Sequence, residues 1–250
     1  MEQSLKDKVA MVTGANGGIG RAVVDAFVEC GMQVVGLDLT FGHTDKVEFL
    51  PIQCDVTDPV QVANAVNMCI KEFGRLDVAF NGAGISGRRF GDGPVHECTD
   101  EGWDTVISTN LSSVFYCCRE ETKVMLKQGS GCIINLSSVL GIVGGDEDFA
   151  THAYAASKAG IIGLTRAIAV TYAKYRISCN VICPGLVKTP MSIRAQRDLK
   201  ILSRLPSLQP LTGGFGLPSD IASLAVYLAG PGSRFMTGAV IVIDGGWTAK

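Results

Sequence analysis

The sequence predicts an α/β protein in which helices cover both faces of a doubly wound parallel sheet of seven strands. Short apolar runs alternate with segments of helical periodicity from one end of the chain to the other, and this alternation is typical of repeated βαβ units. Of the 250 residues, 47% are hydrophobic and 18% are charged, so the chain can form one large core. No linker, internal repeat or low-complexity tract divides the sequence. We therefore expect a single domain spanning residues 1–250.

Seven short apolar runs are predicted to be the strands of this sheet. Pro51 lies inside the third run and cannot donate a backbone hydrogen bond, so this strand is expected at an edge. Right-handed crossovers between successive parallel strands then give the doubly wound order. The predicted strands are Val9–Thr13, Gln33–Asp38, Glu48–Cys54, Val78–Asn81, Cys132–Ser137, Ile177–Cys183 and Val240–Ile243.

The helices between these strands carry recognisable start and stop residues. In the first helix, apolar side chains recur at helical spacing from Ile19 to Cys30, and Gly31 is expected to end it. The second helix is predicted to begin with Asp58 as its cap and Pro59 in its first turn. Its apolar stripe also ends at a glycine.

Residues 185–218 form a long segment without clear periodicity, interrupted by prolines at 190, 206 and 210. A late loop of this kind in an open α/β fold usually covers a ligand, so we expect it to cover the substrate. Its apolar side chains could close over a hydrophobic substrate or pack down on the protein. Its basic residues, with Arg88 and Arg89, could bind an anionic substrate, although solvated surface charge is their more common role. The basic residues of the segment are Arg194, Arg197, Lys200 and Arg204.

Charge and cysteine content argue against several classes of protein. The formal net charge is −2 and the isoelectric point is about 5.9, so neither nucleic acid nor a membrane is an expected partner. The nine cysteines are scattered and form no paired zinc-type clusters, so we expect free thiols and no metal site. Lys6, Asp7 and Lys8 stand where a signal peptide needs an apolar run, which favours a cytoplasmic location.

A glycine-rich turn joins the first predicted strand to the first helix. Glycines in such a turn allow a sharp bend, a close approach of backbone N–H groups to a pyrophosphate, and close packing of helix on sheet. The Gly-Lys-Ser/Thr sequence of an ATPase-type phosphate loop is absent. We therefore predict a nucleotide site at this turn. Its predicted binding residues are Gly14, Asn16, Gly17, Gly18, Ile19 and Gly20.

Asp38 ends the second predicted strand, eighteen residues after Gly20. A carboxylate at this place can accept hydrogen bonds from both ribose hydroxyls of an adenosine and repel a 2′-phosphate. Neither Arg nor Lys occupies positions 16, 17, 39 or 40, so a 2′-phosphate has no evident partner there. We therefore predict NAD as the cofactor, with NADP as the less favoured alternative.

Tyr154 and Lys158 lie four residues apart at the start of a predicted helix, so their side chains share one face. An ammonium group near a phenol favours the phenolate, and we expect Lys158 to lower the pKa of Tyr154 from about 10. Tyr154 is then a candidate general base. Taken alone, the pair could equally be an ordinary feature of a helix surface.

Five motifs in this order resemble the classical short-chain dehydrogenases/reductases over essentially the whole chain. The resemblance implies a Rossmann fold and an enzyme that interconverts a secondary alcohol and a ketone by hydride transfer with a nicotinamide cofactor. The motifs are Thr13-Gly-x-x-x-Gly-x-Gly20, Asn81-Gly-Ala-Gly84 after the fourth strand, Ser138 after the fifth, Tyr154-x-x-x-Lys158, and Pro184-Gly185.

The resemblance also implies a catalytic tetrad of Asn110, Ser138, Tyr154 and Lys158. Ser138 would hydrogen-bond the reacting oxygen, and Tyr154 would take its proton in oxidation or donate it in reduction. Lys158 would hold the nicotinamide ribose, while Asn110 would position a water that links Lys158 to solvent. Because Ser137 precedes Ser138, strand alternation predicts that the two side chains point to opposite sides.

Further cofactor contacts follow from the same resemblance. It places Asp55 at the adenine, Asn81 and Gly84 on the adenosine side, and Val187 and Thr189 at the carboxamide and phosphate. The remaining residues expected at the cofactor are Leu39, Val56, Gly82, Ala83, Pro184 and Gly185.

Two departures from the family pattern carry expectations of their own. The family's usual Asn-Asn-Ala-Gly is Asn-Gly-Ala-Gly here, which predicts a looser turn at Gly82. Sixteen residues separate Ser138 from Tyr154, more than is usual in the family, and we expect extra residues in 144–152 to bulge toward the substrate. His152 is a candidate substrate contact in this segment, with polar surface as the more common alternative.

Several alternatives stay open for function. A 3-oxoacyl thioester reductase using NADPH and a non-catalytic dinucleotide-binding module are the rivals to an NAD-linked alcohol dehydrogenase. Sugars, polyols, hydroxysteroids, hydroxyacyl esters and cyclic diols remain candidate substrates. Residues 220–229 and the C-terminal strand resemble family segments that form dimers and tetramers, so we expect a homotetramer or a homodimer.

Overall fold

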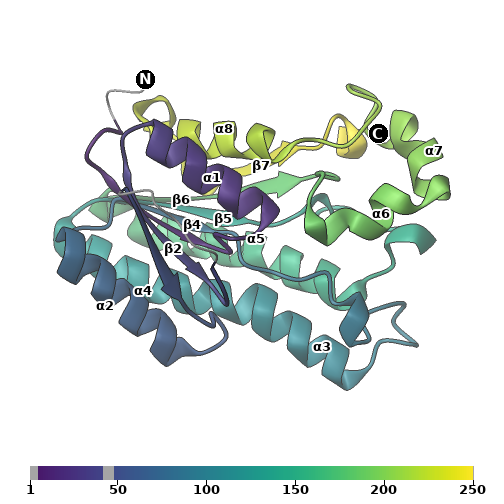
Figure 1. The fold of residues 1–250 in the computed structure, drawn as a ribbon, viewed down its shortest axis with the longest axis horizontal. Helices are drawn as coiled ribbons and strands as arrows, with labels where there is room; N and C mark the ends of the chain where they lie inside the picture. Colours follow the sequence, from purple (N-terminus) through teal and green to yellow (C-terminus); the bar gives the residue numbers. More distant parts are fainter. Residues whose placement is uncertain (1–4, 42–47, 250) are drawn as a thin grey trace.

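A seven-stranded parallel sheet runs through the centre of the protein in the computed structural model, which describes residues 5–41 and 48–249 (Figure 1). The strands follow the order β3-β2-β1-β4-β5-β6-β7, so the predicted doubly wound topology is confirmed. The strands are β1 (Val9–Thr13), β2 (Gln33–Asp38), β3 (Phe49–Gln53), β4 (Val78–Asn81), β5 (Gly131–Leu136), β6 (Ile177–Pro184) and β7 (Val240–Ile243).

The strand that contains proline lies at one end of the sheet, as predicted. Pro51 of β3 pairs with Gly36 of β2, and β3 is the terminal strand of the order, where a missing N–H is tolerated. The predicted bounds of β3 and β5 differ from the observed ones by one residue at each end, and those of β6 by one residue at its C-terminal end. The other four strands have the predicted bounds.

Helices cover both faces of the sheet (Figure 1). Helices α1 (Gly18–Glu29) and α8 (Pro218–Ala229) pack together on one face. The opposite face carries α2 (Pro59–Phe73), α4 (Ser113–Gln128) and α5 (His152–Tyr172), and α3 (Asp100–Ile107) packs beside α5. This arrangement leaves the carboxyl ends of the strands free to form a site.

The two helices that the sequence defined best have the expected ends. Val23 and Phe27 of α1 are fully buried, and Gly31 just beyond the helix has φ +79°, the left-handed conformation that glycine adopts without strain. The Asp58 side chain accepts hydrogen bonds from the first turn of α2. Gly74 follows α2 with φ +73°.

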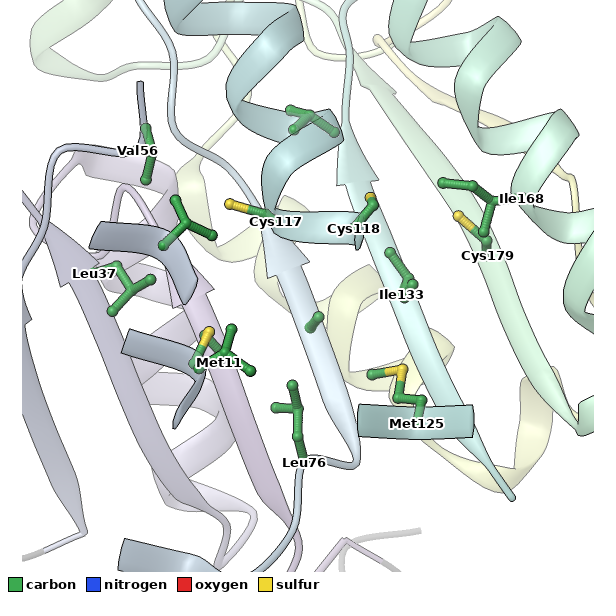
Figure 2. Packing of buried hydrophobic residues seen from close by; sticks show 14 of the residues in the cluster. Met11, Leu37, Val56, Leu76, Cys117, Cys118, Met125, Ile133, Ile168 and Cys179 are labelled. Atoms are coloured by element: carbon green, nitrogen blue, oxygen red, sulfur yellow. The ribbon is translucent and has the colours of Figure 1, made fainter. Parts of the chain in front are cut away.

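Strand alternation divides the apolar residues between two cores, one on each face of the sheet. On β1, Met11 belongs to the core beneath α2, α4 and α5, while Val12 belongs to the core beneath α1 and α8. Figure 2 shows the first core, where Met11 and Ile133 of the sheet lie near Cys117 and Met125 of α4. Among the described residues, no helix combines the length and apolar character needed to cross a bilayer.

Residues 185–218 are more ordered than predicted. The segment contains α6 (Ile193–Arg197) and α7 (Leu199–Leu208), which lie beyond the arrowhead of β6 (Figure 1). Ile201, Leu205 and Leu208 are buried at helical spacing, a periodicity that the prolines obscured. Pro206 lies in the last turn of α7, so it interrupts little of the helix. The expectation of a long irregular loop is therefore wrong.

Candidate active site

A cleft of about 440 Å³ opens at the carboxyl ends of the central strands. Its floor comes from the turn after β1, the turn after β4 and the end of β5. Pro184 at the end of β6 and residues of α6 form another wall. Strand order reverses between β1 and β4, and ligands of open α/β sheets bind at this switch point.

The glycine-rich turn forms one end of the cleft. Helix α1 begins at Gly18 without a side-chain cap and has no acidic residue in its first turn, so its first N–H groups and its positive end are available to an anion. A side chain at position 20 is impossible, since its Cβ would lie 2.0 Å from the carbonyl oxygen of Gly14. The turn thus fits a dinucleotide pyrophosphate, as the sequence predicts. The predicted residues Gly14, Asn16, Gly17, Gly18, Ile19 and Gly20 all line the cleft.

Asp38 lies beside this turn at the end of β2. Its Oδ2 accepts from the backbone N–H of Asn16 at 2.9 Å and its Oδ1 from that of Leu39 at 2.8 Å. The carboxylate lines the cleft, and each oxygen keeps a further lone pair for a ribose hydroxyl. The position matches the one predicted for discrimination between NAD and NADP.

Helix α5 carries the Tyr154–Lys158 pair into the middle of the cleft. The Lys158 Nζ lies 5.5 Å from the centre of the Tyr154 ring and donates to the carbonyl of Leu136 at 3.0 Å. Only 4% of the Lys158 surface is exposed. The two side chains therefore share one helix face and one cavity, although the ammonium is directed to the end of β5.

Burial dominates the proton affinity of both groups. Burial raises the pKa of Tyr154 above its ordinary value of 10.0, and the hydrogen bond with Ser138 lowers it by a smaller amount. Burial also lowers the pKa of Lys158 from 10.5 to about 8. The pKa of Tyr154 is thus raised where a lowering by Lys158 was expected, because loss of hydration outweighs the hydrogen bond with Ser138.

Ser138 lies at the end of β5, where it lines the cleft and interacts with Tyr154. Its hydroxyl also accepts from the N–H of Leu140 at 3.2 Å. The hydroxyl of Ser137 instead donates to the carbonyl of Lys158 at 2.7 Å. The structure thus brings Ser138 to the tyrosine and uses Ser137 to hold α5 against the sheet.

Asn110 is fully buried behind the pair and does not line the cleft. It sits in a π-helical segment, Ser108–Ser112, between α3 and α4, and such segments often occur at functional sites. Its side chain bonds both the N–H and the carbonyl of Ile85, at 2.8 and 3.0 Å. A Cβ on Gly84 would lie 3.1 Å from Asn110 Oδ1 and 3.5 Å from Lys158 Nζ. The Asn110 amide and the Lys158 ammonium therefore both lie next to the backbone of Gly84.

Asp92 is a site residue that the sequence analysis missed. Its carboxylate, only 4% exposed, accepts from the N–H groups of Ala153 and Tyr154, each at 3.0 Å. Thr151 at the start of α5 makes no side-chain cap of its own, so Asp92 caps α5 from a distant loop. In the sequence this aspartate stands between two glycines and indicates only a turn.

Residues 144–152 contain a short 3₁₀ turn, Glu147–Phe149. It lies at the end of the cleft where the substrate is expected. Phe149 lines the cleft and packs edge-on against Trp247, with ring centres 5.0 Å apart. The acidic residues point elsewhere: Asp146 pairs with Arg204, and the Asp148 carboxylate pairs with Lys200 and Arg204 of α7. Of residues 144–152, Phe149 and Thr151 line the cleft.

Several predicted contacts do not line the cleft. The Asn81 side chain points into the core, where it donates to Glu121 and Asn135, so its expected place on the adenosine side is wrong. His152 is exposed outside the cleft, which favours its interpretation as polar surface. Leu39, Asp55, Val56 and Ala83 also lie outside the lining.

The turn at Gly82 is tight, contrary to expectation. The Thr13 hydroxyl accepts from the N–H groups of both Gly82 and Ala83, at 3.1 and 3.2 Å. A Cβ at position 82 would lie 2.6 Å from the ring of Phe80. A side chain at this position would therefore require the Phe80 ring to move.

Comparison with known proteins agrees with this geometry. A family profile described as enoyl-(acyl carrier protein) reductase matches residues 14–248. A rat protein named dehydrogenase/reductase SDR family member 6 is 36% identical, with 98% of each chain covered. The chain belongs to the short-chain dehydrogenase/reductase family.

Other members of the short-chain dehydrogenase/reductase family resemble the chain over its full length. A 3-oxoacyl-[acyl-carrier-protein] reductase of Thermotoga maritima is 37% identical, covering 97% of this chain and 98% of the relative. The crystal structure of levodione reductase superposes with a TM-score of 0.90 at 31% identity, covering 98% of each chain. Like these relatives, the chain is an oxidoreductase that acts on CH–OH groups.

Proposed function

We propose that the protein is an NAD-dependent oxidoreductase that interconverts a small secondary alcohol and a ketone. The observation that carries this proposal is the convergence of Ser138, Tyr154 and Lys158 in one cleft with a glycine cradle and Asp38. A binding module needs the glycine-rich turn but has no use for a half-buried phenol and a buried ammonium beside it. We further propose that residues 185–218 cover the bound substrate.

In this mechanism Tyr154 is the general acid and base. Its oxygen takes the hydroxyl proton as the C–H bond of the carbinol breaks and the C=O bond forms. The glycine-rich turn and Asp38 would hold NAD⁺, which would supply the hydride acceptor. Ser138 holds the reacting oxygen, and the buried site keeps water from that oxygen. Reduction of a ketone follows the same steps in reverse.

Lys158 has two tasks in the proposal. Its ammonium holds the nicotinamide ribose, and its pKa of about 8 lets it pass a proton onward near neutral pH. Asn110 is a positioning residue that orders a water next to Lys158. The π-helical turn and the bonds to Ile85 fix Asn110 for this task.

Tyr154→Phe tests the catalytic assignment. The variant should lose turnover by on the order of 10²–10⁴-fold, because the proton acceptor is removed while the ring remains. The assay is an oxidation screen over sugars, polyols, hydroxysteroids, hydroxyacyl esters and cyclic diols, followed by the absorbance of NADH. NADH binding, measured by fluorescence, should be largely retained. Turnover retained in the variant would contradict the role of Tyr154.

Asp38 supports NAD over NADP, and its replacement tests that choice. The wild-type protein should bind NADH more tightly than NADPH, because the carboxylate accepts ribose hydroxyls and repels a 2′-phosphate. Asp38→Ser should weaken NADH binding roughly tenfold, the loss of about one charge-assisted hydrogen bond. Fluorescence titration with both cofactors measures the ratio. Tighter NADPH binding by the wild-type protein would contradict the assignment.

The likeness to a 3-oxoacyl-[acyl-carrier-protein] reductase favours an NADPH-dependent thioester reductase as the second candidate. Under that alternative the protein would reduce a 3-oxoacyl thioester with NADPH faster than it oxidises any secondary alcohol with NAD⁺. A non-catalytic binding module would bind the dinucleotide and turn over neither class.

We also propose that the chain forms a homotetramer, with a homodimer as the alternative, in the cytoplasm. Hydrophobic side chains near the C-terminal edge of the sheet support assembly: Val242 of β7 is 39% exposed and Phe235 is 97% exposed. No disulfide joins any two of the nine cysteines, which supports a reducing compartment.

A further inference from the structure

Two arginines enter the substrate end of the cleft from opposite walls. Arg88 comes from the 3₁₀ turn Arg88–Phe90 that follows the turn after β4, and Arg194 comes from α6. Both line the cleft together with Ser138 and Tyr154. The wall between them is apolar and includes Phe149.

Both guanidinium groups reach the same neutral acceptor. The Nη2 of Arg88 lies 3.0 Å from the backbone carbonyl oxygen of Asp148, and the Nη2 of Arg194 lies 2.6 Å from the same oxygen. The pKa of Arg88 falls below its ordinary value, first because of burial and second because of the positive charge of Arg194. The negative charges of Asp92 and Asp148 oppose this lowering by a smaller amount. Two like charges thus converge on one neutral carbonyl.

Neither arginine has a strong carboxylate partner. Among the described residues, no carboxylate lies within 4.0 Å of Arg88, and Arg194 reaches only Asp198, at 3.5 Å on an exposed surface, where an ion pair contributes little. The carboxylate of Asp148 is used by Lys200 and Arg204 of α7. Asp146 and Asp148 therefore pair with the basic side chains of α7 and not with Arg88 or Arg194. These two arginines keep N–H donors that are not used.

We propose that Arg88 and Arg194 bind a carboxylate of the substrate, so that the enzyme acts on hydroxy acids and their oxo acids. Guanidinium groups bind carboxylates through paired hydrogen bonds. Arg88 is half-buried and Arg194 is exposed at the mouth of the cleft, so together they favour an anion at this end. The substrate's carbon frame would then lie along Phe149, between the carboxylate and the reacting carbinol at Tyr154. This inference rests on the proposed oxidation of a secondary alcohol.

The first test compares acids with their methyl esters in turnover. Lactate, 3-hydroxybutanoate and 4-hydroxycyclohexanecarboxylate place the carboxylate at different distances from the carbinol. For at least one of these acids, the wild-type enzyme should have a kcat/KM tenfold or more above that for the methyl ester of the same acid. Arg88→Gln and Arg194→Gln should each reduce this acid-to-ester ratio at least tenfold, mainly through KM. Because the ratio is taken within one variant, a loss of folded protein cancels.

Two matched variants sharpen this test. Arg197→Gln removes a charge from the same helix at an exposed position outside the cleft, and it should leave the ratio unchanged. Arg194→Lys keeps the charge but loses the planar fork, so it should recover part of the ratio. If Arg197→Gln lowered the ratio as much as Arg194→Gln, general attraction by surface charge would replace the specific site.

The second test measures binding without turnover. The Tyr154→Phe protein is loaded with NADH and titrated with acetoacetate and with methyl acetoacetate, following NADH fluorescence. Tighter binding of acetoacetate that is lost in Arg88→Gln and Arg194→Gln backgrounds supports the anion site even if no alcohol is oxidised. If no alcohol is oxidised, the proposed function fails. If esters are oxidised as well as acids, or bound as tightly, the carboxylate site fails and the proposed function stands.

Discussion

A carboxyl group buried below the sheet has no part in the proposed reaction. Glu121 of α4 is fully buried, and its Oε2 accepts from Asn81 Nδ2 at 3.1 Å. Its Oε1 and the Oδ1 of Asn81 have no hydrogen-bond partner among the described residues. A proton on Oε1 would supply the missing donor, and buried polar atoms are rarely left unsatisfied.

Burial raises the pKa of Glu121 from 4.5 to about 7, against the opposing effect of the Asn81 hydrogen bond. The other titratable groups around it are the thiols of Cys117, Cys118 and Cys179, whose pKa values are raised by burial. The cysteines are therefore neutral at physiological pH. Glu121 alone in this cluster changes charge between acid and neutral pH.

We predict a pH-dependent stability that originates at Glu121. The folded protein holds this proton more tightly than the unfolded chain, so the stabilisation is complete below pH 4.5 and is lost as pH rises to about 7. The shift corresponds to about 3 kcal/mol in the free energy of unfolding. Glu121→Gln, which carries an amide donor in place of the proton, should flatten this dependence. Urea unfolding at several pH values measures it.

Glu120→Gln is the matched control for this prediction. Glu120 is the neighbouring residue, and its ion pairs with Arg119 and Lys123 lower its pKa, so its stabilisation is present above about pH 4.5 and lost below it. Its replacement should leave the slope between pH 4.5 and 7 unchanged. A wild-type stability that rises over this interval would contradict the role of Glu121.

Helix α5 depends on a cap supplied from outside its own sequence. Most of its first turn is held by the Asp92 carboxylate and by the carbonyl of Gly93, which accepts from the N–H of His152 at 3.2 Å. Because one of the capped groups is the N–H of Tyr154 itself, the cap fixes the backbone from which the proposed acid–base side chain extends.

We expect Asp92→Asn to reduce kcat on the order of tenfold, because one capping oxygen and the negative charge are lost and Tyr154 shifts relative to Ser138. Cofactor binding, measured as the Kd for NADH, should change little. Thr99→Ala is the control, since Thr99 caps the neighbouring helix α3 through Gly102 and does not touch α5. It should cost a similar stability of about 1 kcal/mol without lowering kcat. An equal loss of kcat in both variants would assign Asp92 a purely structural role.

At the scale of the whole molecule, the sheet has two unlike edges. Edge strand β3 contains a proline, which disfavours pairing with another chain, whereas edge strand β7 has the four apolar residues Val240–Ile243. Unprotected edges with exposed hydrophobic groups invite association. This asymmetry supports assembly through β7 and α8.

We predict a mass near four times the 26.4 kDa of one chain by light scattering at micromolar concentration. Val242→Arg should reduce the mass, since it places a charge at the proposed interface. Val60→Arg is the control: Val60 is also exposed, at 64%, but lies at the start of α2 and not in β7 or α8. A monomeric wild-type mass would refute the assembly.

Much of the site could be predicted because its residues follow directly from strand ends and helix periodicity. The glycine turn, Asp38 and the Tyr154–Lys158 face are local patterns, so chain order alone brings them to one edge of a parallel sheet. Helices α6 and α7 were missed because three prolines hid a periodicity that becomes clear only from burial. The prediction for Asn81 failed because its amide satisfies a carboxyl from a distant helix.

The sequence by itself determined the sheet order and the glycine-rich turn, since each depends on local pattern or on the handedness of crossovers. The candidate reacting groups came from the ordered motifs that resemble the family. Only the tertiary structure decided how those groups are tuned. Burial sets the proton affinities of Tyr154 and Lys158, and Asp92 reaches α5 from sixty residues away. Two arginines more than one hundred residues apart converge on one carbonyl, because desolvation and long-range contacts exist only once the chain is packed.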